Sequence, residues 1–328
     1  MYRASDGVAL CIAGYPLPPP IQASTMNQSL TPRIAFLLTL PPLLWAGNAI
    51  VGRLAVGAVP PVALNMARWA LAFVLLYPLG KAALSDWGAL KARWRYLSLL
   101  GLLGMGSYNA LQYLALHTST PLNVTLIAAS SPVWMLGIGA LVYGVRPRAQ
   151  DVAGAVLSLL GVALVIARGQ PARLLDLHFV PGDLLMLLAI LSWAAYSWLL
   201  AKPPANMQGA QRPAWDWAGF LLVQTSFGLV WCGASAGLEA VITQPEWHWT
   251  PWVPAILLYV AVGPSLIAYR CWGLGVATVG PAVAGFFGNL TPVFAAMLSA
   301  AMLGDAPQWF HMAAFGLIVA GILVSSRR

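Results

Sequence analysis

The chain has 328 residues, of which 60% are hydrophobic and only 8% are charged. An ordinary soluble domain carries about 25% charged residues, and a soluble fold of this length could not hide so much apolar surface, because many of its residues must face water. The formal net charge of +8 would suggest nucleic acid in a soluble protein, but in so apolar a chain membrane topology explains it, and we expect no nucleic-acid partner.

Apolar runs bounded by polar or Pro- and Gly-rich stretches predict an all-α polytopic membrane protein with ten transmembrane helices, since one crossing takes about 20 residues. A transmembrane barrel is excluded because these runs are continuously apolar and do not alternate. We expect residues 1–33 to be disordered, with translation starting at Met1 or Met26. The predicted spans are residues 34–53, 62–80, 97–116, 122–143, 151–168, 182–201, 217–238, 251–273, 280–303 and 308–325.

Lys and Arg are unequally divided between the two sides of the predicted membrane. If the chain starts inside, the inner segments hold 13 of the 17 basic residues, the outer segments hold 3, and Arg68 lies within a span. Because basic residues are retained on the cytoplasmic side, this distribution predicts that both termini are cytoplasmic. We expect the chain to lie in a bacterial inner (plasma) membrane as a multi-pass protein.

The chain repeats itself when it is shifted by 160 residues. Prolines and glycines coincide under this shift, among them Pro121 with Pro281 and Gly161 with Gly321. The shift predicts two five-helix repeats, residues 34–168 and 182–325. Five is odd, so the second repeat starts on the opposite side of the membrane from the first. Inverted repeats of this kind are a recurrent architecture of transporters, with the substrate site near the midplane between the halves.

Two of the coinciding prolines fall near the middle of the bilayer. Pro132 and Pro292 each lie about ten residues into a predicted helix, which is roughly mid-membrane at 1.5 Å per residue. A proline there removes a backbone hydrogen bond and exposes a carbonyl. We interpret the symmetric pair as hinges or cavity-lining kinks; the alternative is a pair of packing kinks that membrane helices tolerate.

Four segments carry a resemblance to a known family. They are LLWAGNAIVGR (residues 43–53), VALNMARWALAF (62–73), the block 120–144 and the block 280–307. The sequence resembles the EamA-type members of the drug/metabolite transporter superfamily over about residues 34–325. In that family each block usually ends in a Gly-Glu pair, whereas here the blocks end in Gly144-Val145 and Gly304-Asp305. The resemblance implies a ten-helix plasma-membrane carrier of small metabolites, often an exporter of amino acids or related compounds.

No acidic residue is predicted at mid-membrane. All nine Asp and Glu residues fall in loops or at the ends of predicted helices. Proton antiporters commonly use a buried carboxylate for which substrate and proton compete. The sequence therefore disfavours efflux of cations by carboxylate exchange.

Arg68 is the basic residue that lies farthest from the ends of a predicted span. Burying a guanidinium in a membrane costs several kcal/mol unless it is paired or hydrated, and Asn65 precedes it on almost the same helix face. We hypothesise that Arg68 faces the transport pathway and receives a substrate carboxylate or another anion. The alternative is an arginine that bridges helix carbonyls or extends to the interface.

Uncharged polar and aromatic side chains complete the predicted substrate site. Each has an alternative interpretation as a hydrogen bond between helices, and the aromatic rings beside amides suit amino acids with sizeable side chains. The predicted substrate-binding residues are Asn48, Asn65, Arg68, Tyr108, Asn109, Gln112, Ser131, Trp193, Tyr196, Gln224, Tyr269, Asn289 and Thr291.

Three classes of function remain to be weighed. A membrane enzyme would need convergent acids, His or Cys, and the sequence contains no HExxH motif; we predict no enzyme, no cofactor and no metal site. Inverted repeats favour a carrier over a channel or a regulatory subunit. We predict a secondary transporter, an exporter of amino acids or related zwitterions, in a lipid bilayer and as a monomer or homodimer. The alternative is uptake or exchange of organic anions or phosphorylated metabolites.

Overall fold

The computed structural model describes residues 30–54, 58–115, 118–119, 121–176, 178–243, 246–303 and 308–327. These residues form helices and connecting loops and contain no β-strand. The sequence-based prediction of an all-α membrane protein is therefore confirmed. The expectations for the N-terminal segment before Leu30 and for Gly304-Asp305 concern residues outside the described ranges.

The first half of the described chain runs through seven α-helices and a π-helical turn. They are α2 (Pro32–Leu54), α3 (Pro61–Leu84), α4 (Trp87–Gly101), the π turn η1 (Leu102–Ser107), α5 (Tyr108–Ala115), α6 (Pro121–Ala129), α7 (Ser131–Tyr143) and α8 (Ala149–Ile166). Prolines in the first turn begin α3 and α6, where a missing N–H costs nothing. Asp86 begins α4, because its side chain accepts a hydrogen bond from Ala89 N at 3.0 Å.

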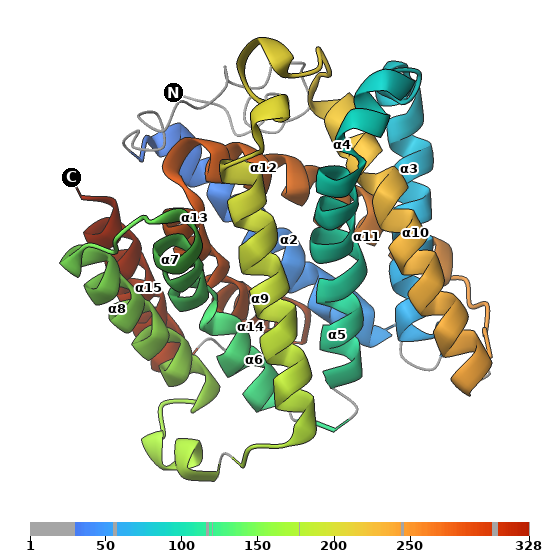
Figure 1. Ribbon diagram of the computed structural model, residues 1–328. Helices are drawn as coiled ribbons and strands as arrows, with labels where there is room; N and C mark the ends of the chain where they lie inside the picture. The colour runs from blue at the N-terminus through green and yellow to red at the C-terminus, as the bar shows by residue number, and fades with distance from the viewer. Residues whose placement is uncertain are drawn as a thin grey trace, which may run out of the picture.

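The second half is also a series of α-helices, interrupted by a π turn and short 3₁₀ turns. It contains the short 3₁₀ turn η2 (Pro171–Asp176), α9 (Pro181–Ala201), the 3₁₀ turns η3 (Ala205–Met207) and η4 (Gly209–Gln211), α10 (Trp217–Thr243), α11 (Val253–Val260), the π turn η5 (Ala261–Ile267), α12 (Ala268–Val279), α13 (Pro281–Gly288), α14 (Thr291–Leu303) and α15 (Trp309–Ser326). In Figure 1, α2 begins, α9 ends and α15 ends on the same side of the molecule, which we call the terminal side.

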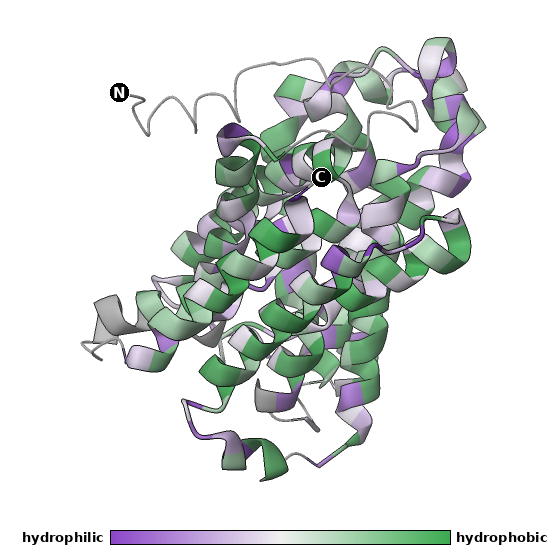
Figure 2. Cartoon of the chain, turned by 90° about the vertical axis from the view of Figure 1, so that its left-hand side faces the viewer, coloured by the Kyte–Doolittle hydropathy of each residue, from purple (hydrophilic) through white to green (hydrophobic). Residues whose placement is uncertain are grey.

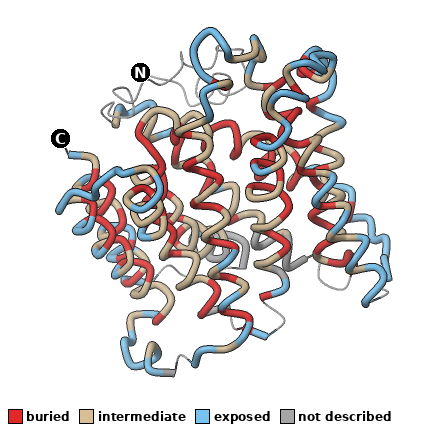
Figure 3. Tube along the Cα trace, in the orientation of Figure 1, coloured by how far each residue is buried: buried red, intermediate tan, exposed pale blue. Residues whose placement is uncertain are grey.

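Seven helical segments of the described chain are long and apolar enough to cross a membrane, and the bent pair α6–α7 would make an eighth. Figure 2 shows hydrophobic residues over the bodies of the helices, and in Figure 3 the buried positions follow the inner faces of the bundle. The chain is thus a polytopic membrane protein, while the count of ten helices stays a prediction. The seven segments are Pro61–Leu84, Ala149–Ile166, Pro181–Ala201, Trp217–Thr243, Val253–Val279, Pro281–Leu298 and Trp309–Ser326.

Glycines bring pairs of helices into close contact. A methyl group added at Gly154 of α8 would lie 2.7 Å from Gly321 O of α15, and one added at Gly80 of α3 would lie 2.8 Å from Ala218 O of α10. Helices pack this closely only where side chains are small, which is how membrane helices associate without a hydrophobic driving force between them. These contacts fix α8 on α15 and α3 on α10.

Regular helix is interrupted at matching places in the two halves. The π turns η1 and η5 lie at nearly the same positions under the shift of 160 residues. The helical segments 123–129 and 131–143 meet at a 42° bend directly before Pro132, and a turn at Asn289–Leu290 separates α13 from α14 just before Pro292. A proline cannot donate to the preceding turn, so both breaks fall where backbone bonding is weakest. A role of these breaks as hinges stays a prediction.

Candidate functional site

A cluster of aromatic rings fills the centre of the bundle. Its hub is Trp193 of α9, whose ring centroid lies 5.2–5.6 Å from those of five other rings. Such distances are typical of favourable ring contacts. Because the rings come from α2, α5, α9 and α12, the cluster joins both predicted repeats. We call it the aromatic cluster; it comprises Trp45, Tyr108, Trp193, Tyr196, Tyr269 and Trp272.

The polar atoms of this cluster are hydrogen-bonded to neighbouring helices. Trp45 Nε1 donates to Pro264 O in η5 at 3.3 Å, and the Tyr269 hydroxyl donates to Gly104 O in η1. Gly104 and Pro264 are equivalent under the shift of 160 residues. Each π turn therefore offers a carbonyl to an aromatic donor from the other predicted repeat, which ties the two halves together at their centre.

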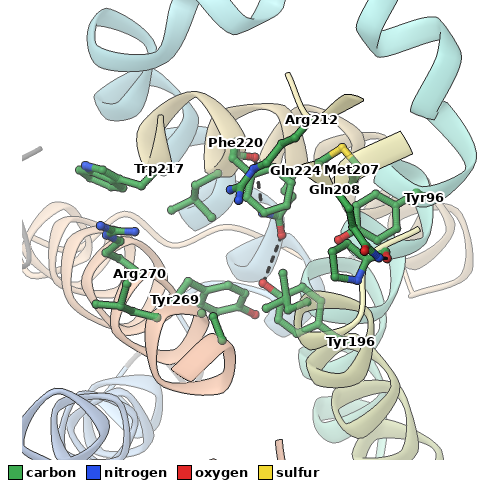
Figure 4. Close-up of a pocket in the computed structure, with 16 residues that line it drawn as sticks. Tyr96, Tyr196, Met207, Gln208, Arg212, Trp217, Phe220, Gln224, Tyr269 and Arg270 are labelled. Atoms are coloured by element: carbon green, nitrogen blue, oxygen red, sulfur yellow. Dashed lines mark hydrogen bonds between the residues drawn. The ribbon is translucent and has the colours of Figure 1, made fainter. Parts of the chain in front are cut away.

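A pocket on the terminal side leads to this cluster (Figure 4). Its rim is formed by the loop that joins α9 to α10, and its inner end is formed by two tyrosines and Gln224. There the Tyr196 hydroxyl donates to Gln224 Oε1 at 3.2 Å. The lining residues are Tyr96, Tyr196, Leu200, Pro203, Met207, Gln208, Arg212, Trp217, Phe220, Leu221, Gln224, Tyr269, Arg270, Gly273, Leu274 and Ala277.

The rim loop is held in place by Arg93 of α4. Its Nε donates to Asn206 O at 2.8 Å and its Nη2 donates to Gln211 O at 2.5 Å. The Asn206 amide donates back to Ala92 O at 3.2 Å. Main-chain contacts of this kind fix the loop on α4, so Arg93 positions the rim and does not line the pocket itself.

The pocket is positively charged. Arg212 and Arg270 are its charged lining residues, and no Asp or Glu is among the described residues that line it. The Arg270 guanidinium lies 5.1 Å from the ring centroid of Trp217, a favourable cation–π arrangement. Burial lowers the pKa of the Arg212 guanidinium, yet an arginine stays protonated at physiological pH. Both charges therefore persist; Asp216, next to the lining residue Trp217, interacts electrostatically with Arg270, and Arg212 favours anionic groups at the rim.

Arg68 does not line the pocket but lies near Tyr269, which does. Only 3% of its surface is exposed, its Nε has no hydrogen-bond partner, and no carboxylate of the described chain lies within 4.0 Å of it. Its guanidinium carbon lies 5.3 Å from the ring centroid of Trp69 and is close enough to Tyr269 and Cys232 to interact electrostatically. The interpretation of Arg68 as an arginine extending to the interface does not fit this burial.

The other predicted site residues fall into four groups. Tyr196, Gln224 and Tyr269 line the pocket. Tyr108 and Trp193 belong to the aromatic cluster, and Asn65 lies beside Arg68 on α3. Outside the pocket lining lie Asn48, Asn109, Gln112, Ser131, Asn289 and Thr291, together with Pro132 and Pro292; Asn289 donates instead to Ser158 Oγ at 2.7 Å.

Sequence reasoning did not select Trp45 and Trp272 as site residues, nor Arg212 and Arg270 of the pocket. Trp45 and Trp272 are two of the many aromatic residues in apolar spans, Arg212 lies between two predicted spans, and Arg270 lies near the end of one. Both arginines lie close to the end of a predicted apolar span, and this position is the sequence signal that could have identified them. The packing that brings α9, α10 and α12 together is a tertiary property that no local pattern encodes.

An all-helical bundle with apolar outer faces, small-residue contacts between helices and a pocket that opens on the terminal side defines an integral membrane protein with room for a small molecule. The sequence pattern of the EamA-like transporter family matches residues 32–167 and again residues 180–327, so the chain belongs to that family. The family is one of transporters, which confirms the expectation that the chain is a membrane transporter and not an enzyme.

Similar proteins cover nearly the whole chain. An uncharacterised transporter of Archaeoglobus fulgidus is 26% identical over 89% of this chain and 96% of its own length. The aromatic amino acid exporter YddG of Ancylobacter novellus is 25% identical, over 87% of this chain and 93% of its own. A probable terminal-alkyne amino-acid exporter of Streptantibioticus cattleyicolor is 23% identical, over 90% and 94%. A solved crystal structure has the same fold, with a TM-score of 0.70 and 23% identity over 89% of this chain and 95% of its own.

Proposed function

We propose that this transporter is a secondary carrier that exports amino acids or related zwitterions from the cytoplasm. In this proposal it lies in a bacterial inner membrane with both termini cytoplasmic. The two inverted five-helix repeats, residues 34–168 and 182–325, rock against each other to give alternating access. The distribution of 13 against 3 basic residues supports this orientation. YedA of Escherichia coli, described as an inner membrane transporter, is 24% identical over 86% of this chain and 87% of its own length.

The side on which the pocket opens supports the proposed direction of transport. Its rim loop joins the terminal-side ends of α9 and α10, which in the proposed orientation is the cytoplasmic side. The opposite end of the bundle is held by a buried carboxylate, since Asp183 accepts hydrogen bonds from Asn123 Nδ2 at 2.8 Å and Val180 N at 2.9 Å. A carrier open toward the cytoplasm is ready to collect an intracellular solute, as an exporter must be.

The observation that carries the proposal is the buried guanidinium of Arg68 near the pocket residue Tyr269. A guanidinium in a membrane interior without a paired carboxylate is costly, and such intramembrane charges mark substrate paths. A substrate carboxylate would compensate it with a charge-assisted hydrogen bond. The rings of the aromatic cluster would then contact an apolar substrate side chain. Two of the similar proteins described above are named as exporters of amino acids, one of them of aromatic ones.

The first experiment compares media of cells that overproduce the protein with media of cells that overproduce Arg68→Gln at matched membrane levels. Untargeted mass spectrometry should find one group of amino acids enriched outside cells with the intact protein and lost in the variant, by about tenfold or more if the charged pair contributes about 1.5–3 kcal/mol. An Arg173→Gln variant, changed at an exposed loop arginine, should export like the parent. Equal export by Arg68→Gln and parent would refute the role of Arg68.

A second function is supported by the charges at the rim. Arg212 and Arg270 line the pocket without an acidic residue among the described lining residues, which would also suit organic anions or phosphorylated metabolites. If the media do not differ, uptake of labelled organic anions by the same strains tests this alternative. Uptake that depends on Arg212 and Arg270 would replace export as the assigned function.

A further inference from the structure

Three buried polar atoms on one face of α3 have no hydrogen-bond partner. They are Asn65 Oδ1, Arg68 Nε and Trp69 Nε1, on side chains that are 0%, 3% and 0% exposed. Residues three and four positions apart are neighbours on a helix, so the three atoms belong to one patch. Buried polar groups are nearly always paired, and a concentration of unpaired ones along a single helical turn points to a ligand that pairs them.

The unpaired atom of Asn65 is its oxygen. Asn65 Nδ2 donates to Met105 O at 3.1 Å and lies 3.4 Å from Cys232 Sγ. Met105 O belongs to the π turn η1 and, as a carbonyl, can only accept. Reversing the amide would place two acceptor oxygens against each other, so the contact with η1 fixes the orientation. Asn65 therefore presents an acceptor.

Arg68 and Trp69 present donors. Arg68 adds a full positive charge that no described carboxylate within 4.0 Å compensates, and Trp69 Nε1 adds a neutral N–H. A negatively charged group with two acceptor oxygens suits this pair, and a carboxylate is such a group. A group carrying N–H donors suits Asn65 Oδ1.

We propose that Asn65, Arg68 and Trp69 form the subsite for the headgroup of an α-amino acid. Arg68 and Trp69 donate to the substrate carboxylate, and Asn65 Oδ1 accepts a hydrogen bond from the α-ammonium. The inference rests on the proposed transport of amino acids and adds to it that the ammonium is recognised by a neutral amide oxygen. The site needs no acidic residue in the membrane, in line with a sequence whose acids lie in loops or at helix ends.

Tyr269 connects this subsite to the pocket. It lines the inner end of the pocket (Figure 4), its ring lies edge-on to Trp69 with centroids 4.9 Å apart, and its hydroxyl donates to Gly104 O. In the proposed binding event Tyr269 leaves Gly104 O, so that a substrate in the pocket can reach the α3 patch. The substrate headgroup then meets α3 while its side chain contacts Trp193 and the other rings of the aromatic cluster.

The test uses the full-length protein in proteoliposomes loaded with the standard amino acids. The best-transported amino acid is then competed with its 2-hydroxy, 2-oxo and decarboxylated counterparts. We expect the 2-oxo acid and the amine to compete at least about tenfold less well than the amino acid, since each lacks one of the two matched groups. The 2-hydroxy acid should fall between, because its hydroxyl can still donate to Asn65 Oδ1.

Equal competition by the 2-oxo acid would overturn the ammonium half of the subsite, and equal competition by the amine would overturn the carboxylate half. Transport of an amino acid would remain in both cases, so the proposed function would stand. If no standard amino acid is transported, the proposed function itself fails and the subsite with it.

Substitutions on α3 test whether its residues cause the preference for the amino acid over the 2-oxo acid. Asn65→Leu should lower transport of the amino acid and abolish its preference over the 2-oxo acid. Arg68→Lys, which keeps the charge, should retain part of the activity that Arg68→Gln loses. Asn123→Leu is the matched control, because this buried amide contacts His178 O and Asp183 and should leave the preference intact. An unchanged preference in Asn65→Leu would contradict the proposal, because a merely structural role lowers transport of both compounds alike.

Discussion

At the scale of single residues, Asp183 shows how this protein accommodates a buried acid. The side chain is 1% exposed, and its oxygens accept from Ser119 Oγ, from Asn123 Nδ2 at 2.8 Å and from Val180 N at 2.9 Å. These donors come from the segment after α5, from α6 and from the start of α9. The carboxylate thus joins the two predicted repeats at the end of the bundle opposite to the pocket.

Removing this carboxylate should destabilise the protein. Asp183→Ala removes an acceptor from Ser119 Oγ, Asn123 Nδ2 and Val180 N, and we expect a loss on the order of 3 kcal/mol in the free energy of unfolding. Thermal unfolding of the purified protein in detergent measures it. Asp86→Ala is the control, because Asp86 caps α4 in an exposed position and should cost only about 1 kcal/mol. Equal losses in the two variants would show that the Asp183 contacts contribute little.

Arg68 and Asn65 could be found from the sequence, whereas their surroundings could not. A charged residue inside an apolar run is rare, so Arg68 identifies α3 as a candidate part of the substrate site. The hydrogen bond from Asn65 to Met105 O depends on the π turn η1. The local sequence of Leu102–Ser107 does not predict that turn. The same holds for Asn289, predicted as a site residue and bonded instead to Ser158.

At the scale of helices, the contact between α8 and α15 depends on backbone proximity. A methyl group at Gly154 would lie 2.7 Å from Gly321 O, whereas one at Gly316, also on α15, meets nothing within 4 Å. Two backbones this close cannot admit even the smallest side chain without moving apart. Gly321, one of the glycines that mark the repeat in the sequence, therefore has a packing role here.

The two positions predict opposite effects of the same substitution. Gly154→Ala should destabilise the bundle by about 1–3 kcal/mol, because overpacking forces the helices apart. Gly316→Ala should leave stability unchanged or raise it by up to about 1 kcal/mol, since alanine is the better helix former. Size-exclusion chromatography after heating gives both melting temperatures. A melting temperature of Gly154→Ala at or above that of Gly316→Ala would disprove the close-packing argument.

At the scale of the whole molecule, hydropathy alone was enough for the helical membrane fold, because burial in lipid demands long apolar segments whatever their packing. The pocket needed the structure. In the sequence, the loop that forms its rim looks like an ordinary polar connection. Arg93 donates hydrogen bonds to carbonyls of this loop, although it lies more than a hundred positions away from them in the chain. Contacts between residues so far apart in the chain produce no periodic pattern in the sequence.

The side to which this rim faces is the last prediction. Gln208 lines the pocket and is exposed, and Gln170 is exposed in the loop between α8 and α9 at the opposite end. In a chain whose three cysteines are replaced by serine, Gln208→Cys should react with a membrane-impermeant thiol reagent in inverted vesicles and not in whole cells. Gln170→Cys should do the reverse. Labelling of Gln208→Cys from outside whole cells would place the pocket and the termini outside, because the basic loops and the rim share one side, and it would overturn the proposed orientation.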